Sequence, residues 1–137
     1  MEPSSTGPWD VELAELAHRV ELAQAMGGAE AVARHHERGR LTIRERIDKL
    51  ADAHSFNEIG RLTGKASYDD AGRLVSVIPA NYLMGEARVD GRPVVIAGYD
   101  YTVRGGATDG GLLDKRSYAE RMAHDQKVPL VRLVEGA

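Results

Sequence analysis

Residues 85–107 read GEARVDGRPVVIAGYDYTVRGGA and combine a tight turn, an apolar strand and a glycine-rich loop. Asp90-Gly91 lies between two apolar segments, which is a strong signal for a two-residue hairpin because both turn positions need positive φ. Residues 93–98 (PVVIAG) are almost all apolar, as expected of a strand that is covered on both faces. This stretch therefore predicts a hairpin whose second strand is buried in an α/β core.

The loop that follows this strand is unusually rich in glycine. After Gly98, two aspartates, one arginine and four glycines occur by residue 111. Glycine permits positive φ and a close approach of backbone to a ligand. The loop leaves the carboxyl end of a strand and enters a helix, where free N–H groups attract anions and carbonyl oxygens. The spacing matches neither the P-loop nor the dinucleotide-binding fingerprint. Both a ligand-contacting loop, with Arg104 as a phosphate partner, and a plain connection therefore stay open.

A helix and a further strand complete this unit. A helix is predicted from about residue 111 to residue 126, and residues 128–134 (VPLVRLV) form the next strand. One side of the helix is apolar and carries Leu112, Ala119, Met122 and Ala123. Strand, helix and strand within about 40 residues predict a right-handed parallel βαβ unit. Upstream, residues 74–78 (LVSVI) and 83–89 (LMGEARV) are further candidate strands.

The first half of the chain, from Trp9 to about Ala53, has a helical pattern. Asp10 is the expected cap of a first helix. The apolar stripe of this helix consists of Leu13, Leu16, Val20 and Ala23. A second helix is predicted from about residue 29 to residue 38, ending at Gly39. Thr42 and Glu45 form a capping-box pattern for a third helix. Its apolar face consists of Ile43, Ile47 and Leu50.

Composition excludes several classes of protein. A length of 137 residues corresponds to one domain or part of one, and the absence of cysteine excludes disulfides and thiolate metal sites. A net charge of −3 gives no general attraction to nucleic acid, and no apolar run approaches the roughly 20 residues of a membrane helix. Because the N-terminus lacks the layout of a signal peptide, a cytoplasmic location is expected.

Two other clusters of polar residues are weaker candidates. Residues 34–40 (RHHERGR) suggest a basic patch, but Glu37 interrupts it and no aromatic residue is interleaved. A solvated helix face is therefore the preferred interpretation. Asp100 and Asp109 could pair as acid and base. Capping and turn formation are the more common roles of aspartates in such loops.

Three segments, in order, resemble the carboxyltransferase subunits of biotin-dependent acyl-CoA carboxylases, a family that includes propionyl-CoA carboxylase β subunits. Residues 26–60 resemble the N-terminal region of these subunits, and RGRLTIRERIDKL (38–50) resembles their helix-opening segment. Residues 85–107 resemble the first core hairpin, with D-x-T-V-x-G-G at positions 100–106. Residues 114–137 resemble the helix and strand that follow.

The resemblance implies a crotonase-like α/β fold, built from ββα units behind a helical N-terminal arm. It divides the chain into a disordered N-terminus (1–8), a helical arm (9–60) and the first ββα portion of the carboxyltransferase N-domain (61–137). In the family, a glycine-rich turn that would begin at residues 136–137 supplies N–H groups to the enolate oxyanion. The domain is therefore expected to be incomplete. It could be a truncated piece of a longer subunit, part of a split protein or a degenerate remnant.

The implied function is transfer of a carboxyl group from carboxybiotin to an acyl-CoA, in fatty acid metabolism. The implied acyl-CoA-binding residues are Thr102, Val103, Arg104, Gly105, Gly106 and Lys115, although Lys115 could instead serve helix packing. No catalytic residue, no metal ligand and no directly bound cofactor is expected. Because the resemblance places the complete oxyanion hole and the biotin pocket outside these residues, the chain alone is expected to be inactive.

The implied partners are the rest of the carboxyltransferase or a second subunit, a biotin carboxyl carrier protein and biotin carboxylase, in a homo- or hetero-oligomer. No nucleic acid or membrane partner is expected. The alternative is a non-catalytic interaction module, or a split subunit, that docks on a partner chain.

Overall fold

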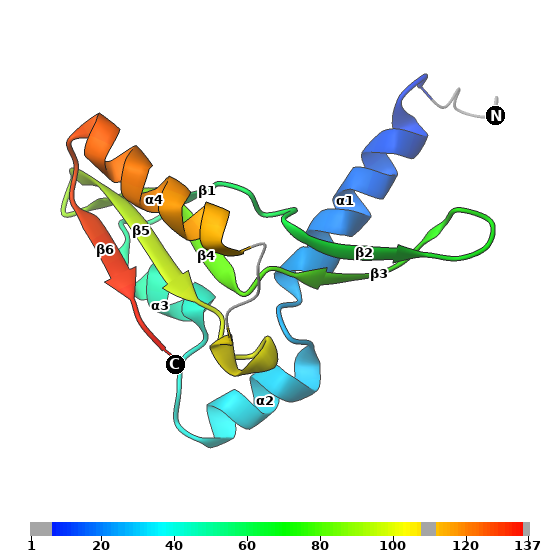
Figure 1. The fold of residues 1–137 in the computed structure, drawn as a ribbon, viewed down its shortest axis with the longest axis horizontal. Helices are drawn as coiled ribbons and strands as arrows, with labels where there is room; N and C mark the ends of the chain where they lie inside the picture. The colour runs from blue at the N-terminus through cyan, green and yellow to red at the C-terminus, as the bar shows by residue number, and fades with distance from the viewer. Residues whose placement is uncertain (1–6, 108–111, 136–137) are drawn as a thin grey trace, which may run out of the picture.

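Three helices precede two separate sheets and a fourth helix (Figure 1). The computed structural model describes residues 7–107 and 112–135. The helices are α1 (Asp10–Gln24), α2 (Ala29–Glu37), α3 (Ile43–Leu50) and α4 (Leu112–Gln126), with a short 3₁₀ turn η1 (Arg104–Gly106). The strands are β1 (Asn57–Glu58), β2 (Gly64–Tyr68), β3 (Leu74–Pro79), β4 (Tyr82–Val89), β5 (Arg92–Tyr99) and β6 (Leu130–Leu133). In the described part of the chain, no helix is long and apolar enough to cross a membrane.

The main sheet confirms the predicted hairpin and the predicted parallel strand–helix–strand unit. Its strand order is β1-β4-β5-β6. β4 and β5 are antiparallel across Asp90-Gly91, and these turn residues have φ values of 50° and 75°. β5 and β6 are parallel, with Ile96 opposite Val131, and α4 makes the crossover between them. The two-residue turn and the apolar run therefore place β5 inside the sheet.

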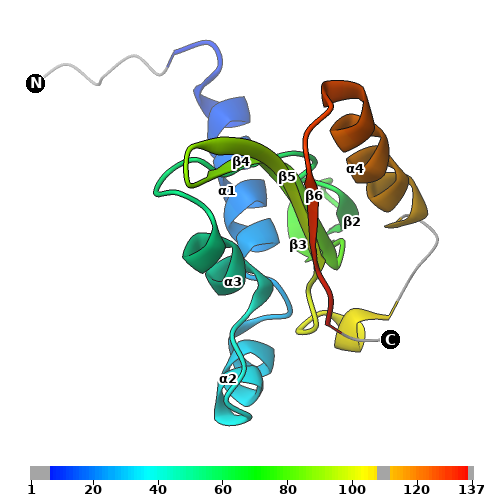
Figure 2. The same ribbon diagram turned by 90° about the vertical axis from the view of Figure 1, so that its left-hand side faces the viewer.

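β5 divides the hydrophobic core into two layers. Val95 and Ala97 face a cluster that includes Ala119 and Ala123 of α4. The alternate residues of β5 face a second cluster on the α3 side, which includes Ile43, Ile47, Val94 and Ile96. Figure 2 shows α3 and α4 on opposite sides of the sheet. The near-continuous apolar sequence of β5 follows from this double cover.

At Gly98, β5 lies close to both α3 and β6. A Cβ atom at this position would lie 2.4 Å from Ile43 Cδ1 and 2.7 Å from the Leu133 carbonyl oxygen. Close packing therefore requires glycine at position 98, because any side chain there would separate β5 from α3 and β6.

The predicted capping box of α3 is present. Thr42 Oγ1 accepts a hydrogen bond from the Glu45 N–H at 3.3 Å, and Glu45 Oε2 accepts one from the Thr42 N–H at 2.7 Å. His36 Nε2 lies 2.9 Å from the same carboxylate. Together, His36 and Thr42 lower the pKa of Glu45 to about 2. The start of α3 is thereby fixed, with Ile43 and Ile47 turned toward the core.

The predicted apolar stripe of α1 is buried only at its C-terminal end. Ala23 is buried, but Leu13 is 59% exposed and Leu16 is also exposed. The reason is that α1 extends away from the main sheet and packs on β3 of the separate β2–β3 hairpin (Figure 1). The expected cap is also wrong: Trp9 occupies the N-cap position, and the Asp10 carboxylate accepts a hydrogen bond from the Gly7 N–H instead.

Candidate functional site

The loop between β5 and α4 begins with a buried aspartate. Asp100 Oδ1 accepts hydrogen bonds from the N–H of Thr102 at 2.9 Å and from its hydroxyl at 2.6 Å. Burial raises the pKa of Asp100, and the two hydrogen bonds from Thr102 act in the opposite direction. Asp100 therefore has the turn-forming role, and Asp109, its suggested acid–base partner, lies outside the described residues.

Three successive residues of this loop have positive φ. The values are 52° for Arg104, 62° for Gly105 and 74° for Gly106. A Cβ atom on Gly105 would meet only the Tyr101 ring, at 4.0 Å, so conformation rather than space demands this glycine. Arg104 and Gly105 are exposed, whereas Val103 and Gly106 are buried. The loop thus turns back on itself and presents Arg104 and Gly105 outward.

Asn81 holds both ends of this turn and was not predicted from the sequence. Its fully buried side-chain amide donates hydrogen bonds to the carbonyl oxygens of Val103 at 3.3 Å and Ala107 at 2.7 Å. Its own carbonyl oxygen accepts a hydrogen bond from the Asp100 N–H at 2.9 Å. Its Oδ1 atom has no hydrogen-bond partner among the described residues. A single asparagine between two predicted strands usually indicates a turn, so no local pattern indicated this role.

The segment between α1 and α2 contacts the loop through Gly27. The Gly27 N–H donates a hydrogen bond to Thr102 Oγ1 at 3.0 Å. A Cβ atom on Gly27 would lie 2.0 Å from the Thr102 carbonyl oxygen, so only glycine allows this approach. Thr102, an expected ligand contact, is therefore held between Asp100 and the helical segment.

An aromatic contact joins the same loop to α2. The Tyr101 ring lies 5.7 Å from the His35 ring, and the Arg40 guanidinium lies 5.5 Å from the Tyr101 centroid. His35 is only 3% exposed, and its Nε2 atom lies 3.2 Å from the Leu41 carbonyl oxygen and 3.5 Å from Glu135 Oε1. The expectation of a solvated face for residues 34–40 is thus wrong for His35, which turns inward beneath the loop.

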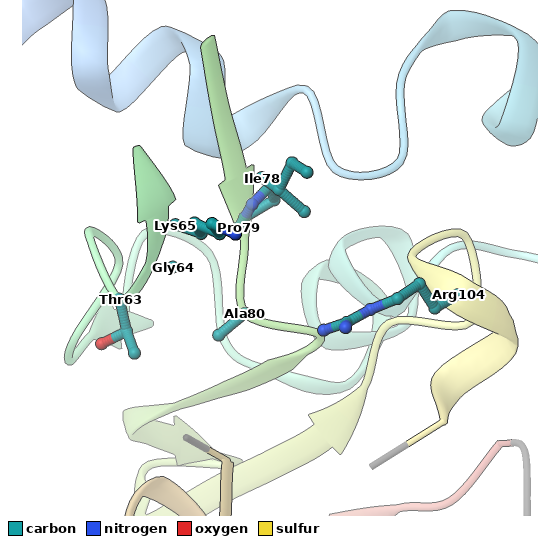
Figure 3. A pocket seen from close by; sticks show the side chains of 7 residues that line it. All are labelled: Thr63, Gly64, Lys65, Ile78, Pro79, Ala80 and Arg104. Carbon is teal, nitrogen blue, oxygen red and sulfur yellow. The ribbon is translucent and has the colours of Figure 1, made fainter. Parts of the chain in front are cut away.

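A hollow of about 350 Å³ lies between the loop and the base of the β2–β3 hairpin. Its walls are mainly apolar. The lining residues are Thr63, Gly64, Lys65, Ile78, Pro79, Ala80 and Arg104. Figure 3 shows Arg104 extending from the loop toward Ala80, with the hairpin residues on the far side. We call this space the apolar hollow; it offers a path for an uncharged, extended ligand beside the glycine turn.

Lys115 lies apart from the loop in sequence and in its contacts. Its Nζ atom donates a hydrogen bond to the Gly60 carbonyl oxygen at 3.0 Å, and the residue is only 9% exposed. Loss of solvent lowers the pKa of Lys115 to about 8, while Glu58 acts in the opposite direction. Lys115 lines a further hollow of about 380 Å³. Because Thr63 lines both this space and the apolar hollow, the two adjoin.

The sequence profile of the carboxyl transferase domain family matches residues 34–137. The chain belongs to this family. It is 37% identical over 94 residues to the methylmalonyl-CoA carboxyltransferase 12S subunit of Propionibacterium freudenreichii subsp. shermanii, covering 68% of the chain and 18% of that protein. It is 37% identical over 118 residues to a probable biotin-dependent acyl-coenzyme A carboxylase beta2 subunit of Mycobacterium tuberculosis, covering 84% of the chain and 21% of that protein.

Solved structures agree with the sequence comparison. A transcarboxylase 12S structure with methylmalonyl-coenzyme A and methylmalonic acid bound superposes with a TM-score of 0.82 at 26% identity, covering 96% of the chain and 26% of that chain. A single-chain, multi-domain long-chain acyl-CoA carboxylase gives a TM-score of 0.77 at 29% identity, covering all of the chain and 15% of that chain. The fold is therefore the expected crotonase-like α/β arrangement, and the chain spans about a fifth of the length of its curated relatives.

Proposed function

We propose that this chain is part of the carboxyltransferase component of a biotin-dependent acyl-CoA carboxylase. The component would move a carboxyl group from carboxybiotin to an acyl-CoA. The observation that supports this function is a glycine turn, fixed by Asn81 and Thr102, beside an apolar hollow of about 350 Å³ in a member of the carboxyl transferase domain family.

The residues of the loop would divide into supporting and contacting groups. Thr102 and Val103 are engaged inside the protein, so they would hold the loop in place. Arg104 is exposed and lines the hollow, and its neighbour Gly105 is also exposed, so these two residues would contact the pantetheine arm. Gly106 would supply the conformation of the turn, and Lys115 would line the adjoining hollow.

The chain would supply the acyl-CoA side of the reaction. Biotin, carried on a separate carrier protein and loaded by biotin carboxylase, would bring the carboxyl group. No described residue of this chain is assigned to biotin or to a metal. The carboxyl transfer itself would need groups from other parts of the carboxyltransferase, in an oligomer.

A pair of matched glycine variants tests the proposed site. Gly105 and Gly91 both have positive φ, 62° and 75°, and an added Cβ atom meets no atom closer than 4.0 Å at Gly105 and none within 4 Å at Gly91. Valine should therefore cost each site about 1–3 kcal/mol of unfolding free energy. Calorimetric titration with propionyl-CoA should show at least about tenfold weaker binding for Gly105→Val only. Equal affinities of the two variants would place the ligand elsewhere.

The alternative function, docking on a partner chain, is favoured by one group of exposed apolar side chains. These residues lie on or beside α1 and on the β2–β3 hairpin: Trp9, Val11, Leu13, Leu16, Tyr68, Val75 and Ile78. Such clusters commonly mark sites of association. Light scattering of the chain at high micromolar concentration should show a dimer or larger species. A clean monomer would argue against self-association through this surface.

A further inference from the structure

We propose that Lys115 is a site of covalent acylation, at which the side-chain amine accepts the acyl group of a small acyl thioester. The thioester class rests on the proposed function, whereas the site itself rests on the surroundings of the amine. Lys115 lies in the first turn of α4 and lines the hollow of about 380 Å³ that adjoins the apolar hollow. We call this space the lysine hollow. Its volume falls within the range of small-molecule pockets in proteins, about 300–1,000 Å³.

The amine of Lys115 is buried, and no carboxylate among the described residues pairs with it. Its Nζ atom donates a hydrogen bond to the Gly60 carbonyl oxygen at 3.0 Å. Glu58, which acts on the amine through its charge, is held by Arg44, with 2.8 Å between Nη1 and Oε2 and 3.2 Å between Nη2 and Oε1. Asp114 also lines the lysine hollow, but in the described ranges no ion pair joins it to Lys115.

These surroundings favour the neutral amine, which is the nucleophilic form. Loss of solvent lowers the pKa of Lys115 to about 8, with Arg44 acting in the same direction and Glu58 opposing it. The N-terminal end of α4 also disfavours a positive charge. At pH 7, about 10% of such an amine is neutral, against about 0.03% of a lysine with the ordinary pKa of 10.5. Lysines that proteins use as nucleophiles are activated by the same loss of solvent.

The acylation step is balanced without a further reactant. The lone pair of Nζ attacks the carbonyl carbon of the thioester, an N–C bond forms and the C–S bond breaks. The sulfur leaves with the electron pair of the broken bond and takes up the proton that the nitrogen loses. The products are an amide on Lys115 and a free thiol.

The contacts of Lys115 favour an acyl group over carbon dioxide, the other electrophile that the proposed function would bring near. The amide is uncharged, and its N–H can still donate to the Gly60 carbonyl oxygen. Its acyl chain has Ile59 and Met84 as apolar neighbours in the lysine hollow. A carbamate would instead place an anion near that carbonyl oxygen and the charge of Glu58, both of which repel it.

Thr63 connects the lysine hollow to the proposed path of the ligand, because it lines both this space and the apolar hollow. A thioester whose arm occupies the apolar hollow can therefore reach Nζ past Thr63. Lys65 also lines the apolar hollow but is exposed, and Lys49 is exposed elsewhere, on α3. Lys65 thus shares the access of Lys115 without its burial, and Lys49 has neither.

Peptide mass spectrometry of the wild-type 137-residue chain tests the site without any mutation. The chain is incubated with propionyl-CoA or with S-propionyl-N-acetylcysteamine, a propionyl thioester that lacks the nucleotide. At pH 7, Lys115 should be propionylated at least about tenfold faster than Lys49 and Lys65; the ratio stays below that of the neutral fractions because a less basic amine is a weaker nucleophile. The rate at Lys115 should level off above about pH 9, whereas the rates at the two exposed lysines should keep rising.

Concentrated urea and two variants provide the controls. Unfolding the chain should remove the preference for Lys115, because burial creates it. Lys115→Arg keeps a positive charge but removes the amine, so the fast-reacting site should disappear, whereas Lys65→Arg should retain it. The inference is wrong if Lys115 in the folded chain reacts no faster than Lys49 and Lys65. A preference that persists in urea would also overturn it, since the folded surroundings would then not be the cause.

The two thioesters distinguish this inference from the proposed function. Calorimetric binding of propionyl-CoA without preferential reaction at Lys115 would retain the acyl-CoA function and reject the acylation site. Conversely, preferential reaction of Lys115 at equal rates with both thioesters, without calorimetric binding of propionyl-CoA, would retain the acylation site and reject the acyl-CoA function.

Discussion

β5 and β3 are both rich in apolar residues, but they lie in different surroundings. In β5, Val95 and Ile96 are fully buried between α4 and α3. In β3, Val75 is 60% exposed and Ile78 is also exposed, because this hairpin packs mainly on α1. Apolar residues thus indicate a strand in both places, while the number of layers that cover the strand decides its burial.

This difference predicts where the stability of the molecule is concentrated. A fully buried valine or isoleucine contributes about 1.5–3 kcal/mol relative to an exposed one. The core around β5 contains many such residues, whereas much of the apolar surface of α1 and the β2–β3 hairpin stays in water. We therefore expect mutations in the core to have large effects on unfolding, and those in the α1–hairpin region to have small ones.

The largest effect is expected at Gly98. Gly98→Ala would place a Cβ atom 2.4 Å from Ile43 Cδ1 and 2.7 Å from the Leu133 carbonyl oxygen. The clash with backbone should lower the free energy of unfolding by about 3 kcal/mol or more. The control is Gly72→Ala at the hairpin tip, where φ is 75° and no atom lies within 4 Å of the new Cβ; its loss should be about 1 kcal/mol. Urea denaturation measures the free energy of unfolding of both variants. Equal losses would mean that Gly98 in the main sheet is no more tightly packed than the tip of the β2–β3 hairpin.

Lys115 should give the next largest effect, and it should depend on pH. Because the pKa of Lys115 falls from 10.5 to about 8 on folding, the unfolded chain binds more protons between these values. The free energy of unfolding should therefore rise with pH from about 8 to about 10.5, by up to about 3 kcal/mol from this residue. Lys115→Met should remove that rise, whereas Lys49→Met, at an exposed position, should retain it. Identical pH profiles for wild type and Lys115→Met would show that the amine is solvated.

The cap of α3 should contribute a moderate amount. Thr42→Ala removes the hydroxyl that accepts the Glu45 N–H, and the loss should be about 1 kcal/mol. Thr42→Ser keeps the hydroxyl and should retain most of the stability. The contribution of Glu45 is present above pH 4.5 and should disappear as pH falls toward 2, because its pKa is lowered in the folded state. Thermal unfolding between pH 2 and pH 6 would show this, and equal losses for alanine and serine would exclude the hydroxyl as the cause.

The smallest effect is expected on α1. Leu13→Ser should change the free energy of unfolding by less than about 0.5 kcal/mol, because Leu13 is largely exposed. Ile47→Ala in the core should lose about 2–5 kcal/mol in the same assay. A loss above about 1 kcal/mol for Leu13→Ser would show that α1 packs against something in solution.

Local signals in the sequence predicted the core well. The Asp90-Gly91 turn, the capping box at Thr42 and the apolar run of β5 each depend on neighbouring residues, and all are present. β2 was missed because GKASY has few β-branched or aromatic residues, and β1 is only two residues long. The exposure of α1 could not be predicted, because periodicity indicates an apolar face but not what covers it.

The candidate site was predictable only in part. The turn at residues 104–106 could be expected because consecutive glycines suggest unusual φ values. The role of Asn81 depends on carbonyl groups 22 and 26 residues away, and that of Lys115 on a carbonyl group 55 residues away. Such contacts arise from the folded topology, and no local pattern encodes them.

The β2–β3 hairpin is inserted in the sequence between β1 and β4 and does not belong to the main sheet. Its base is closed by a hydrogen bond of 2.8 Å from the Ala80 N–H to the Thr63 carbonyl oxygen. Its tip, at residues 69–73, is exposed except for the half-buried Asp69 and is held by Asp69 itself. The length of the β2–β3 hairpin is therefore independent of the register of the main sheet. In evolutionary terms, this tip is a place where the chain can gain or lose residues, or accept an inserted peptide, without disturbing the core.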